Sequence, residues 1–369
     1  MNKPIVFLLS LMALTACTKQ QTTGIHLENL DTTAVAQNDF YQYACGGWMK
    51  NNPIPDEYSR FGSFDKLGLS NLEQVNGLIA DIAAGTHKMG SIPQKIGDVY
   101  NLSMDTARRN QEGIAPVLPV LQEIENVTDK AQWSEVLGKA MDFGLWAMYV
   151  DADAMNSSMN ILNEYQAGFA LSQKDYYIDE DEHTKHIREE YVKHVEKMFE
   201  LFGQENAAEK AQTVLRLETR LANAALSNVE LRDPVANYNK MSVEELQKLV
   251  PEVDWKVYFA GLNIAPDSLS VGQVRHLQEA GKMLAEESLE DMKTLFTWQV
   301  IDGSADFLTE EIFMQNFEFY GRILSGRQEP TPLWKRAVAM VNGTLGEAVG
   351  QMYVEKYFPE ENKERMIGL

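Results

Sequence analysis

The sequence is poor in basic residues and lacks a long apolar run. Its 33 lysines and arginines are outnumbered by 54 acidic residues, which gives a formal net charge of −21. Proteins that bind nucleic acids carry basic faces, so we expect no nucleic-acid partner. The apolar run at the amino terminus, 5–14, is too short to cross a bilayer.

The amino terminus instead predicts an exported, membrane-anchored protein. Lys3 provides a basic start, and the apolar run after it ends in Leu14-Thr-Ala-Cys17, a small-residue cleavage site. This tetrad is typical of a bacterial lipobox, in which the cysteine is lipidated and becomes the mature amino terminus. We therefore expect a signal peptide over 1–16, lipidation at Cys17 and a flexible polar tether over 17–37. A plain secretory signal that happens to end near a cysteine is the alternative.

These features predict a lipoprotein that faces the periplasm or lies at the cell surface, with the outer membrane favoured. Cys45 is the only other cysteine. Once Cys17 is lipidated, Cys45 has no partner for an internal disulfide, although the compartment would allow one. We expect Cys45 to be a buried, inert thiol.

The sequence also lacks the motif of a zinc peptidase. Such a site needs two imidazoles on one helical face, a third ligand and a carboxylate base, usually as His-Glu-x-x-His. No histidine is followed by glutamate and a second histidine four residues on; the six are His26, His87, His183, His186, His194 and His276. His183 and His186 lie among acidic residues and could bind a metal weakly, but a solvated helix start is the favoured interpretation. We expect no metal, cofactor or catalytic centre in this chain.

A dense block near the amino terminus is the most distinctive feature present. It runs from Asp39 to Asp65 and crowds aromatic residues, paired glycines and spaced prolines together with Arg60. The block shows no helical or strand period, so it predicts a loop that positions something. Gly46 and Gly47 are expected to permit a tight turn.

Further along the chain, helical periodicity dominates. Apolar residues recur at three- and four-residue steps over 72–82, 187–202 and 334–352, and 206–225 is rich in helix formers. Thr331 and Pro332 predict the start of the last of these helices. Two short β-favouring runs, 146–150 and 159–162, predict a small hairpin. The fold class is therefore mainly α, a large helical domain with a small β-hairpin element. In the last helix, Asn342 and Gly343 interrupt the apolar stripe and predict either a satisfied buried amide with close backbone approach or the join to a partner domain.

Two segments resemble the neprilysin and endothelin-converting-enzyme family of zinc metallopeptidases. They are the block from Asp39 to Asp65 and the segment from Trp334 to Val354, and the resemblance extends from about Asp39 to about Met366. It implies that 38–369 forms the amino-terminal, covering domain of such an enzyme. The catalytic domain, where the family holds its zinc, is absent from this chain.

The resemblance also assigns two site residues. Ser59-Arg-Phe-Gly-Ser-Phe-Asp65 matches the family's Ser-Arg-aromatic-Gly-x-Phe-Asp. By that resemblance Arg60 contacts the carboxylate end of a bound peptide, and Asp65 holds the arginine in place. The planar fork of arginine suits this role, since it grips a carboxylate with two charge-assisted hydrogen bonds. The alternative is an Arg60–Asp65 pair that only ties the loop down.

The resemblance predicts a substrate-enclosing domain of a zinc metalloendopeptidase that acts on peptides and is inactive alone. Its partners would be peptide substrates, a catalytic half and a membrane reached through Cys17. Family chains continue beyond the position of Leu369, which is consistent with a truncated or split gene product, a frameshift or a fragment. The alternative function is a non-catalytic surface lipoprotein that binds peptides or a protein partner.

Overall fold

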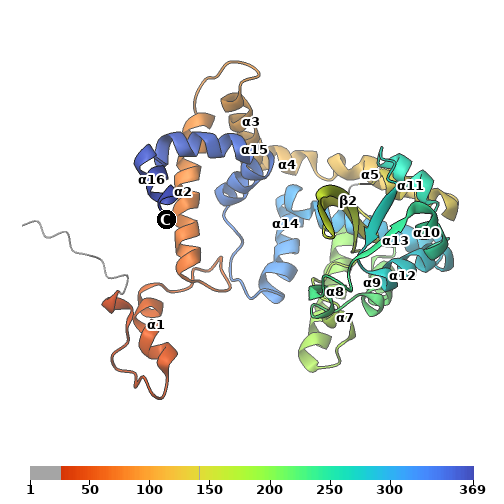
Figure 1. Cartoon of the computed structure of the whole chain (residues 1–369), viewed down its shortest axis with the longest axis horizontal. Helices are drawn as coiled ribbons and strands as arrows, with labels where there is room; N and C mark the ends of the chain where they lie inside the picture. Colours follow the sequence, from red (N-terminus) through yellow and green to blue (C-terminus); the bar gives the residue numbers. More distant parts are fainter. Residues whose placement is uncertain (1–25, 141) are drawn as a thin grey trace, which may run out of the picture. The chain divides into compact units, whose positions relative to one another are not determined.

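The computed structural model describes residues 26–140 and 142–369 (Figure 1). The predicted signal peptide, Cys17 and the first part of the tether lie outside the described residues. None of the described helices is long and apolar enough to cross a membrane. The chain divides into two compact units, one ending at Pro55 and the other beginning at Asp56, and each is described by itself.

The first unit contains a helix where the sequence predicted a loop. Helix α1, Phe40–Asn51, begins after Asp39, whose carboxylate accepts a 2.9 Å hydrogen bond from the backbone of Gln42. A Cβ on Gly47 would lie 2.3 Å from the carbonyl oxygen of Glu28, in the 3₁₀ turn η1, Leu27–Asn29. The paired glycines therefore allow the helix to approach the preceding segment and do not form a turn. Cys45, on this helix, is a free thiol and is half-buried rather than buried.

The second unit is mainly helical, as predicted. Its helices are α2 Ser63–Ala83, α3 Ile92–Met104, α4 Thr106–Glu112, α5 Leu118–Glu125, α6 Trp133–Lys139, α7 Asp175–Ile178, α8 Glu182–Leu201, α9 Ala207–Ala224, α10 Val243–Leu249, α11 Trp255–Gly261, α12 Val274–Glu286, α13 Leu289–Ser304, α14 Glu310–Asn316, α15 Leu333–Tyr357 and α16 Glu360–Ile367. A π-helical segment, Phe317–Ile323, continues α14. The stretches predicted as helices correspond to α2, α8, α9 and α15, which confirms those predictions, although α2 begins at Ser63, before the predicted stretch 72–82.

Local sequence explains where several helices begin and end. The Asp181 carboxylate caps α8 by accepting from the backbone of Thr184 at 3.0 Å. Gly203, just past the end of α8, has a φ of +67°, a left-handed conformation that favours glycine. Helix α15 begins one residue later than predicted, with Pro332 at the capping position.

Helix α15 bends at Leu345, whose φ of −132° and ψ of 25° are not helical. Asn342 and Gly343 lie just before this bend. Asn342 is exposed, and no atom lies within 4 Å of a Cβ built on Gly343. The predicted buried amide and close backbone approach are therefore wrong, and these residues mark a bend in the helix.

A four-stranded sheet contains the predicted hairpin. Strands β1, Trp146–Asp153, and β2, Asn156–Gln166, pair antiparallel, and the sheet order is β1-β2-β4-β3. Strand β4, Ser268–Val271, runs parallel to β2, and β3, Asn239–Ser242, pairs antiparallel with β4. The hairpin is confirmed, with strands longer than predicted, whereas β3 and β4 were not foreseen.

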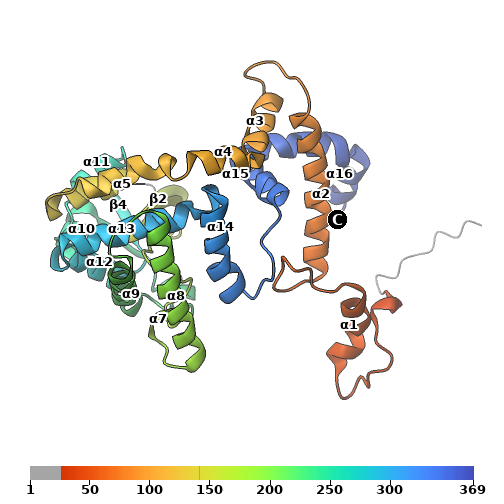
Figure 2. The ribbon, with the colours of Figure 1, turned by 180° about the vertical axis from the view of Figure 1, so that it is seen from behind.

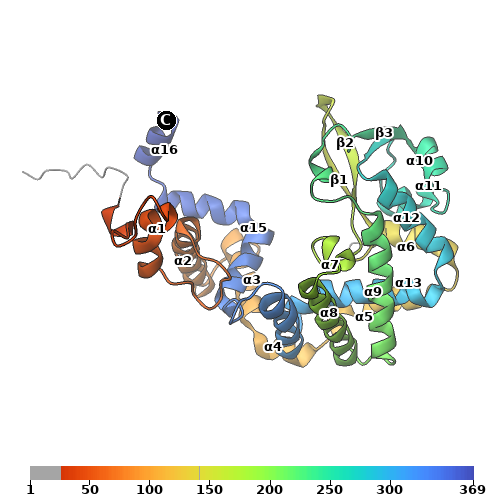
Figure 3. The same ribbon diagram turned by 90° about the horizontal axis from the view of Figure 1, so that it is seen from below.

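The second unit has three hydrophobic clusters. The largest packs the sheet against α6, α11, α12 and α13, with α5 lying along α13 (Figure 2). Another is built on the neighbouring helices α8 and α9 together with α13 and the π-helical segment (Figure 3). The smallest joins α2, α3 and α15 through Val75, Ile79, Ile96, Val338, Val341 and Val349.

Candidate functional site

The segment that carries Arg60 leads directly into α2. Arg60 is exposed, and Gly62 stands at the capping position of the helix. The carboxylate of Asp65 accepts a 2.7 Å hydrogen bond from the backbone N–H of Gly62. Among the ion pairs of the described residues, none joins Arg60 to Asp65. Asp65 therefore holds the start of α2, and the contact that the resemblance implied between the two side chains is not formed.

Residues just before Arg60 are anchored to the start of α15. The backbone N–H groups of Gln328 and Glu329 donate to the carbonyl of Asp56 at 2.9 and 3.0 Å. The ammonium of Lys335, only 7% exposed, forms an ion pair with Glu57. Burial is the largest single effect on Lys335 and lowers its pKa, but the hydrogen bonds to Glu57 and Tyr58 and the charge of Glu57 together outweigh it, so the pKa lies above its usual range. These contacts fix the backbone that presents Arg60 and leave its guanidinium open to a ligand.

The first half of α2 presents an exposed apolar face. Phe64 and Leu67, three residues apart and so on one side of the helix, are 86% and 67% exposed. Burial on this helix begins only at Val75. Exposed large apolar side chains on one helical face are typical of an interaction surface.

The described residues contain no group of three or more histidine, cysteine, aspartate or glutamate side chains that could hold a metal ion. His183 and His186 both lie exposed near the start of α8. His194 and His276 are buried, and burial lowers their pKa values to about 3 and about 4. These two are neutral core histidines. The described residues therefore do not fit the zinc site of a peptidase, and no zinc chemistry is assigned to them.

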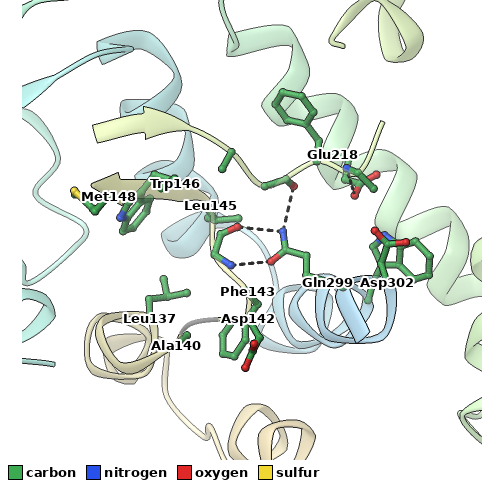
Figure 4. A pocket seen from close by; sticks show the side chains of 18 of the residues that line it. Leu137, Ala140, Asp142, Phe143, Leu145, Trp146, Met148, Glu218, Gln299 and Asp302 are labelled. Atoms are coloured by element: carbon green, nitrogen blue, oxygen red, sulfur yellow. Dashed lines mark hydrogen bonds between the residues drawn. The ribbon is translucent and has the colours of Figure 1, made fainter. Parts of the chain in front are cut away.

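A cavity of about 500 Å³ lies within the second unit (Figure 4). It is bounded by the end of α6, the start of β1, the segment 167–170 and the helices α9 and α13. Most of its described lining is apolar or aromatic: Leu137, Phe143, Leu145, Trp146, Met148, Phe169, Tyr258, Leu262 and Trp298. The polar lining side chains are Asp142, Glu218, Gln299 and Asp302.

Glu218 is the centre of a buried hydrogen-bond network at this cavity. Its Oε2 accepts from the hydroxyls of Tyr177 at 3.0 Å and Tyr191 at 2.7 Å, and its Oε1 accepts from the backbone of Ala170 at 3.1 Å. The Tyr191 hydroxyl in turn accepts from the indole N–H of Trp298 at 2.9 Å. Because an indole nitrogen can only donate, the direction of these bonds is fixed.

Burial raises the pKa values of both carboxyls in the cavity wall. The pKa of Glu218 rises to about 8 and that of Asp302 to about 7, in each case mainly through loss of solvent. Our sequence reasoning missed this cluster. A signal was available, since Glu218 interrupts the apolar stripe formed by Val214, Leu217 and Leu221 on α9. An acidic residue on the buried face of an amphipathic helix indicates a buried polar site.

Residues 36–369 match Peptidase family M13, in its amino-terminal domain. Endothelin-converting enzyme 1 from Bos taurus is 25% identical over 358 residues, which cover 92% of this chain and 47% of that protein. Endothelin-converting enzyme-like 1 from Mus musculus is also 25% identical and also covers 92% of this chain. The chain thus spans about half the length of the curated relatives it matches.

Comparison with solved structures gives a consistent result. The zinc metalloprotease Zmp1 of Mycobacterium tuberculosis, in complex with an inhibitor, superposes with a TM-score of 0.87 at 30% identity. That comparison covers 94% of this chain and 54% of Zmp1. PepO from Lactobacillus rhamnosis HN001 shares the fold, with a TM-score of 0.77 at 20% identity over 91% of this chain and 54% of PepO.

The fold and the matched residues define a neprilysin-like amino-terminal domain. This chain belongs to Peptidase family M13.

Proposed function

We propose that this chain is the substrate-enclosing domain of a neprilysin-like zinc metalloendopeptidase that acts on peptides. The observation that carries the proposal is the extent of the match, because residues 36–369 fit the amino-terminal domain of the family while spanning about half of a zinc metalloprotease. The zinc and the catalytic groups would come from a separate catalytic half. The domain would not hydrolyse peptides alone.

The exposed apolar face of α2 supports the presence of a separate catalytic half. Phe64 and Leu67 lie exposed near the start of the helix, on the body whose small core joins α2, α3 and α15. Burying an apolar face of this kind is favourable by roughly 25 cal/mol for each Å² of apolar surface removed from water. We infer that the catalytic half covers this face and completes the body.

Arg60 supports a peptide as the substrate. The anchored segment from Asp56 to Tyr58 fixes the backbone beside an exposed guanidinium, which can bind the terminal carboxylate of a peptide with two parallel hydrogen bonds. Asp65 contributes by holding the start of α2, through Gly62, and so positions the segment that carries Arg60.

The decisive test is the nucleotide sequence that follows codon 369. A His-Glu-x-x-His motif in frame, or shifted by one base, within the next few hundred codons would supply the catalytic half. Co-expression of that half with this chain should then give a zinc-containing complex that cleaves a fluorogenic peptide, whereas each half alone should not. If no such motif follows, the non-catalytic peptide-binding lipoprotein is the better description.

A further inference from the structure

Strand β1 lies at one edge of the sheet, and β2 is its only neighbouring strand among the described residues. An edge strand leaves a row of backbone N–H and C=O groups unpaired, which another extended chain can use. Proteins often protect such an edge with a proline or a bulge. Here β1 contains no proline, and its bulge lies at the far end, between Ala152 and Asp153. Of residues 147–152, all but Met148 are exposed, so the edge is open to solvent.

The pairing of β2 shows which backbone groups of β1 face outward. The C=O of Glu164 on β2 accepts from the backbone N–H of Gly272, which directly follows β4, at 3.2 Å. The backbone groups of Glu164 therefore point away from β1, and its partner Met148 has no ladder hydrogen bonds to β2. Because the direction of these groups alternates along a strand, the N–H and C=O of Met148 and of Val150 point to the free edge. No other backbone hydrogen bond of the described residues reaches them.

The cavity of about 500 Å³ lies at the start of this strand. Trp146, Ala147 and Met148 of β1 line it (Figure 4). Trp146 and Met148 share one face of the sheet, because side chains alternate between the faces along a strand. A residue of an added strand that pairs with Met148 would lie on that same face, so its side chain would point toward the cavity. The start of β1 therefore offers a ladder for a backbone beside a pocket for a side chain.

The polar side chains in the interior of the cavity wall already have partners within the protein. Gln299 accepts from the backbone N–H of Gly144 at 2.9 Å and donates to the carbonyls of Gly144 and Gly168 at 3.1 and 3.3 Å (Figure 4). The other pairs are Glu218 with Tyr177 and Tyr191, Asp302 with Tyr320, Trp146 with Tyr258, and Trp298 with Tyr191. The surface that remains for a ligand is apolar and aromatic, which favours an apolar side chain.

We propose that β1 and this cavity together bind an extended peptide as an additional strand of the sheet, with an apolar or aromatic side chain in the cavity. Backbone hydrogen bonds to Met148 and Val150 hold the peptide, and the cavity selects the side chain that enters. The proposal goes beyond the proposed function. Binding of this kind requires neither zinc nor a catalytic half, so it can fail while the proposed function stands.

The charge around the site favours a free peptide as the occupant. Asp142 and Asp151 are exposed beside it, and none of the described lining side chains is lysine, arginine or histidine. This charge suits a neutral or basic peptide and disfavours a second copy of a chain whose net charge is −21. A small apolar molecule would fill the cavity but would leave the backbone groups of β1 unpaired.

Isothermal titration calorimetry on the purified chain tests the proposal, with acetyl-Lys-Val-Thr-Phe-Thr-Val-Lys-amide as the probe. We expect one peptide bound per chain. The same peptide with alanine in place of phenylalanine should bind at least tenfold more weakly, because the cavity then stays unfilled.

Two N-methylated forms of the probe test the backbone pairing. With the phenylalanine side chain in the cavity, the N–H of the phenylalanine points at β1, whereas the N–H of the threonine that follows it points to solvent. N-methylation of the phenylalanine should therefore weaken binding at least tenfold, and N-methylation of that threonine less than threefold. The two peptides are matched controls, since they differ only in the position of one methyl group.

Variants locate the site on the protein. Val150→Pro removes an outward N–H at an exposed position, which edge strands tolerate, and should weaken binding at least tenfold. Val150→Thr keeps this N–H and should change binding less than twofold. Ala140→Phe fills the cavity from its half-buried rim and leaves β1 intact, so it should abolish the difference between the phenylalanine and alanine peptides.

Absence of binding at millimolar concentration, equal losses for the two N-methylated peptides, or unchanged binding by both Val150→Pro and Ala140→Phe would overturn the proposal. Sedimentation velocity tests a second copy as the occupant. A dimer of the natural chain that Val150→Pro dissociates would assign the edge to that copy and overturn the proposal. Probe binding that disappears when a catalytic half is supplied would assign the edge to that half, with the same consequence.

Discussion

The hydroxyl of Tyr191 donates a 2.7 Å hydrogen bond to the carboxylate of Glu218 in the interior of the second unit. The two residues come from neighbouring antiparallel helices, α8 and α9, and both are fully buried. The hydroxyl also accepts from Trp298, so it links three elements of the core. A single oxygen atom therefore satisfies a buried donor and a buried acceptor at once.

Removal of the Tyr191 hydroxyl should destabilise the folded protein. Tyr191→Phe leaves the indole N–H of Trp298 without an acceptor and takes one donor from Glu218, so we expect a loss of roughly 1–3 kcal/mol in the free energy of unfolding. Urea denaturation measures the loss, and Tyr149→Phe, at an exposed position on β1, is the control. Equal stability of both variants would mean that the network contributes nothing.

The thermal midpoint should fall as the pH rises from 6.5 to 8.5. Burial raises the pKa values of Glu164 and Glu218 to about 8 and that of Asp302 to about 7, above their values in an unfolded chain. In this window the folded state binds more protons than the unfolded state, so stability decreases with pH. The buried histidines have lowered pKa values and act in the opposite sense, but only below about pH 6.5.

Differential scanning fluorimetry across this pH range checks the direction in which the thermal midpoint changes. Glu164→Gln should show a flatter profile than the natural chain, and the exposed Glu311→Gln should not. A midpoint that stays constant or rises would contradict the assignment of these carboxyls.

Gly47→Ala should destabilise the first unit. The new Cβ would lie 2.3 Å from the Glu28 carbonyl oxygen, a backbone atom that cannot move aside cheaply, and we expect a cost of about 1–3 kcal/mol. Hydrogen exchange of residues 27–51 reports the effect locally. Gly68→Ala is the matched control, because its Cβ would meet no atom within 4 Å and should stabilise α2 by about 0.5–1 kcal/mol.

Arg60→Met should weaken peptide acids more than peptide amides, once a catalytic half is supplied. Loss of a charge-assisted contact to the terminal carboxylate is worth about 1.5–3 kcal/mol, or roughly ten- to a hundredfold in affinity. Inhibition constants for matched acid and amide peptides measure the difference. Equal losses for both would assign Arg60 to the stability of the segment.

If the chain is the lipoprotein that its sequence predicts, Cys17→Ala should abolish membrane attachment, because the predicted lipobox places this cysteine at the cleavage site. Metabolic labelling with radioactive palmitate and fractionation of cells measure lipidation and partition. Unchanged labelling and partition would show that the anchor lies elsewhere.

Helical periodicity predicted much of the fold, and the reason is physical. Over α2, α8 and α15 the apolar residues recur at three- and four-residue steps, and α9 is rich in helix-forming residues, so the sequence alone indicates each of these helices. Helix α1 was missed because Gly46 and Gly47 normally indicate a turn. Their purpose is apparent only once the segment that approaches α1 is placed.

The sheet and the cavity depend more on tertiary structure. Strands β3 and β4 have only four residues each, and β3 contains Asn239, Lys240 and Ser242, which do not favour strands by themselves. Asp302 and Glu218 lie far apart in the sequence and line one cavity only because α9 packs against α13. The pairing of Glu57 with Lys335 is likewise set by the fold.

The small core that joins α2, α3 and α15 also constrains the order in which the chain can fold. Val75, Ile79 and Ile96 are translated early, but Val338, Val341 and Val349, which complete their packing, emerge more than two hundred residues later. Closing so long a loop is slow, and contacts of this separation form late. During synthesis the apolar sides of α2 and α3 should therefore remain open until the last tenth of the chain emerges, which makes this stretch the natural target of a holding chaperone.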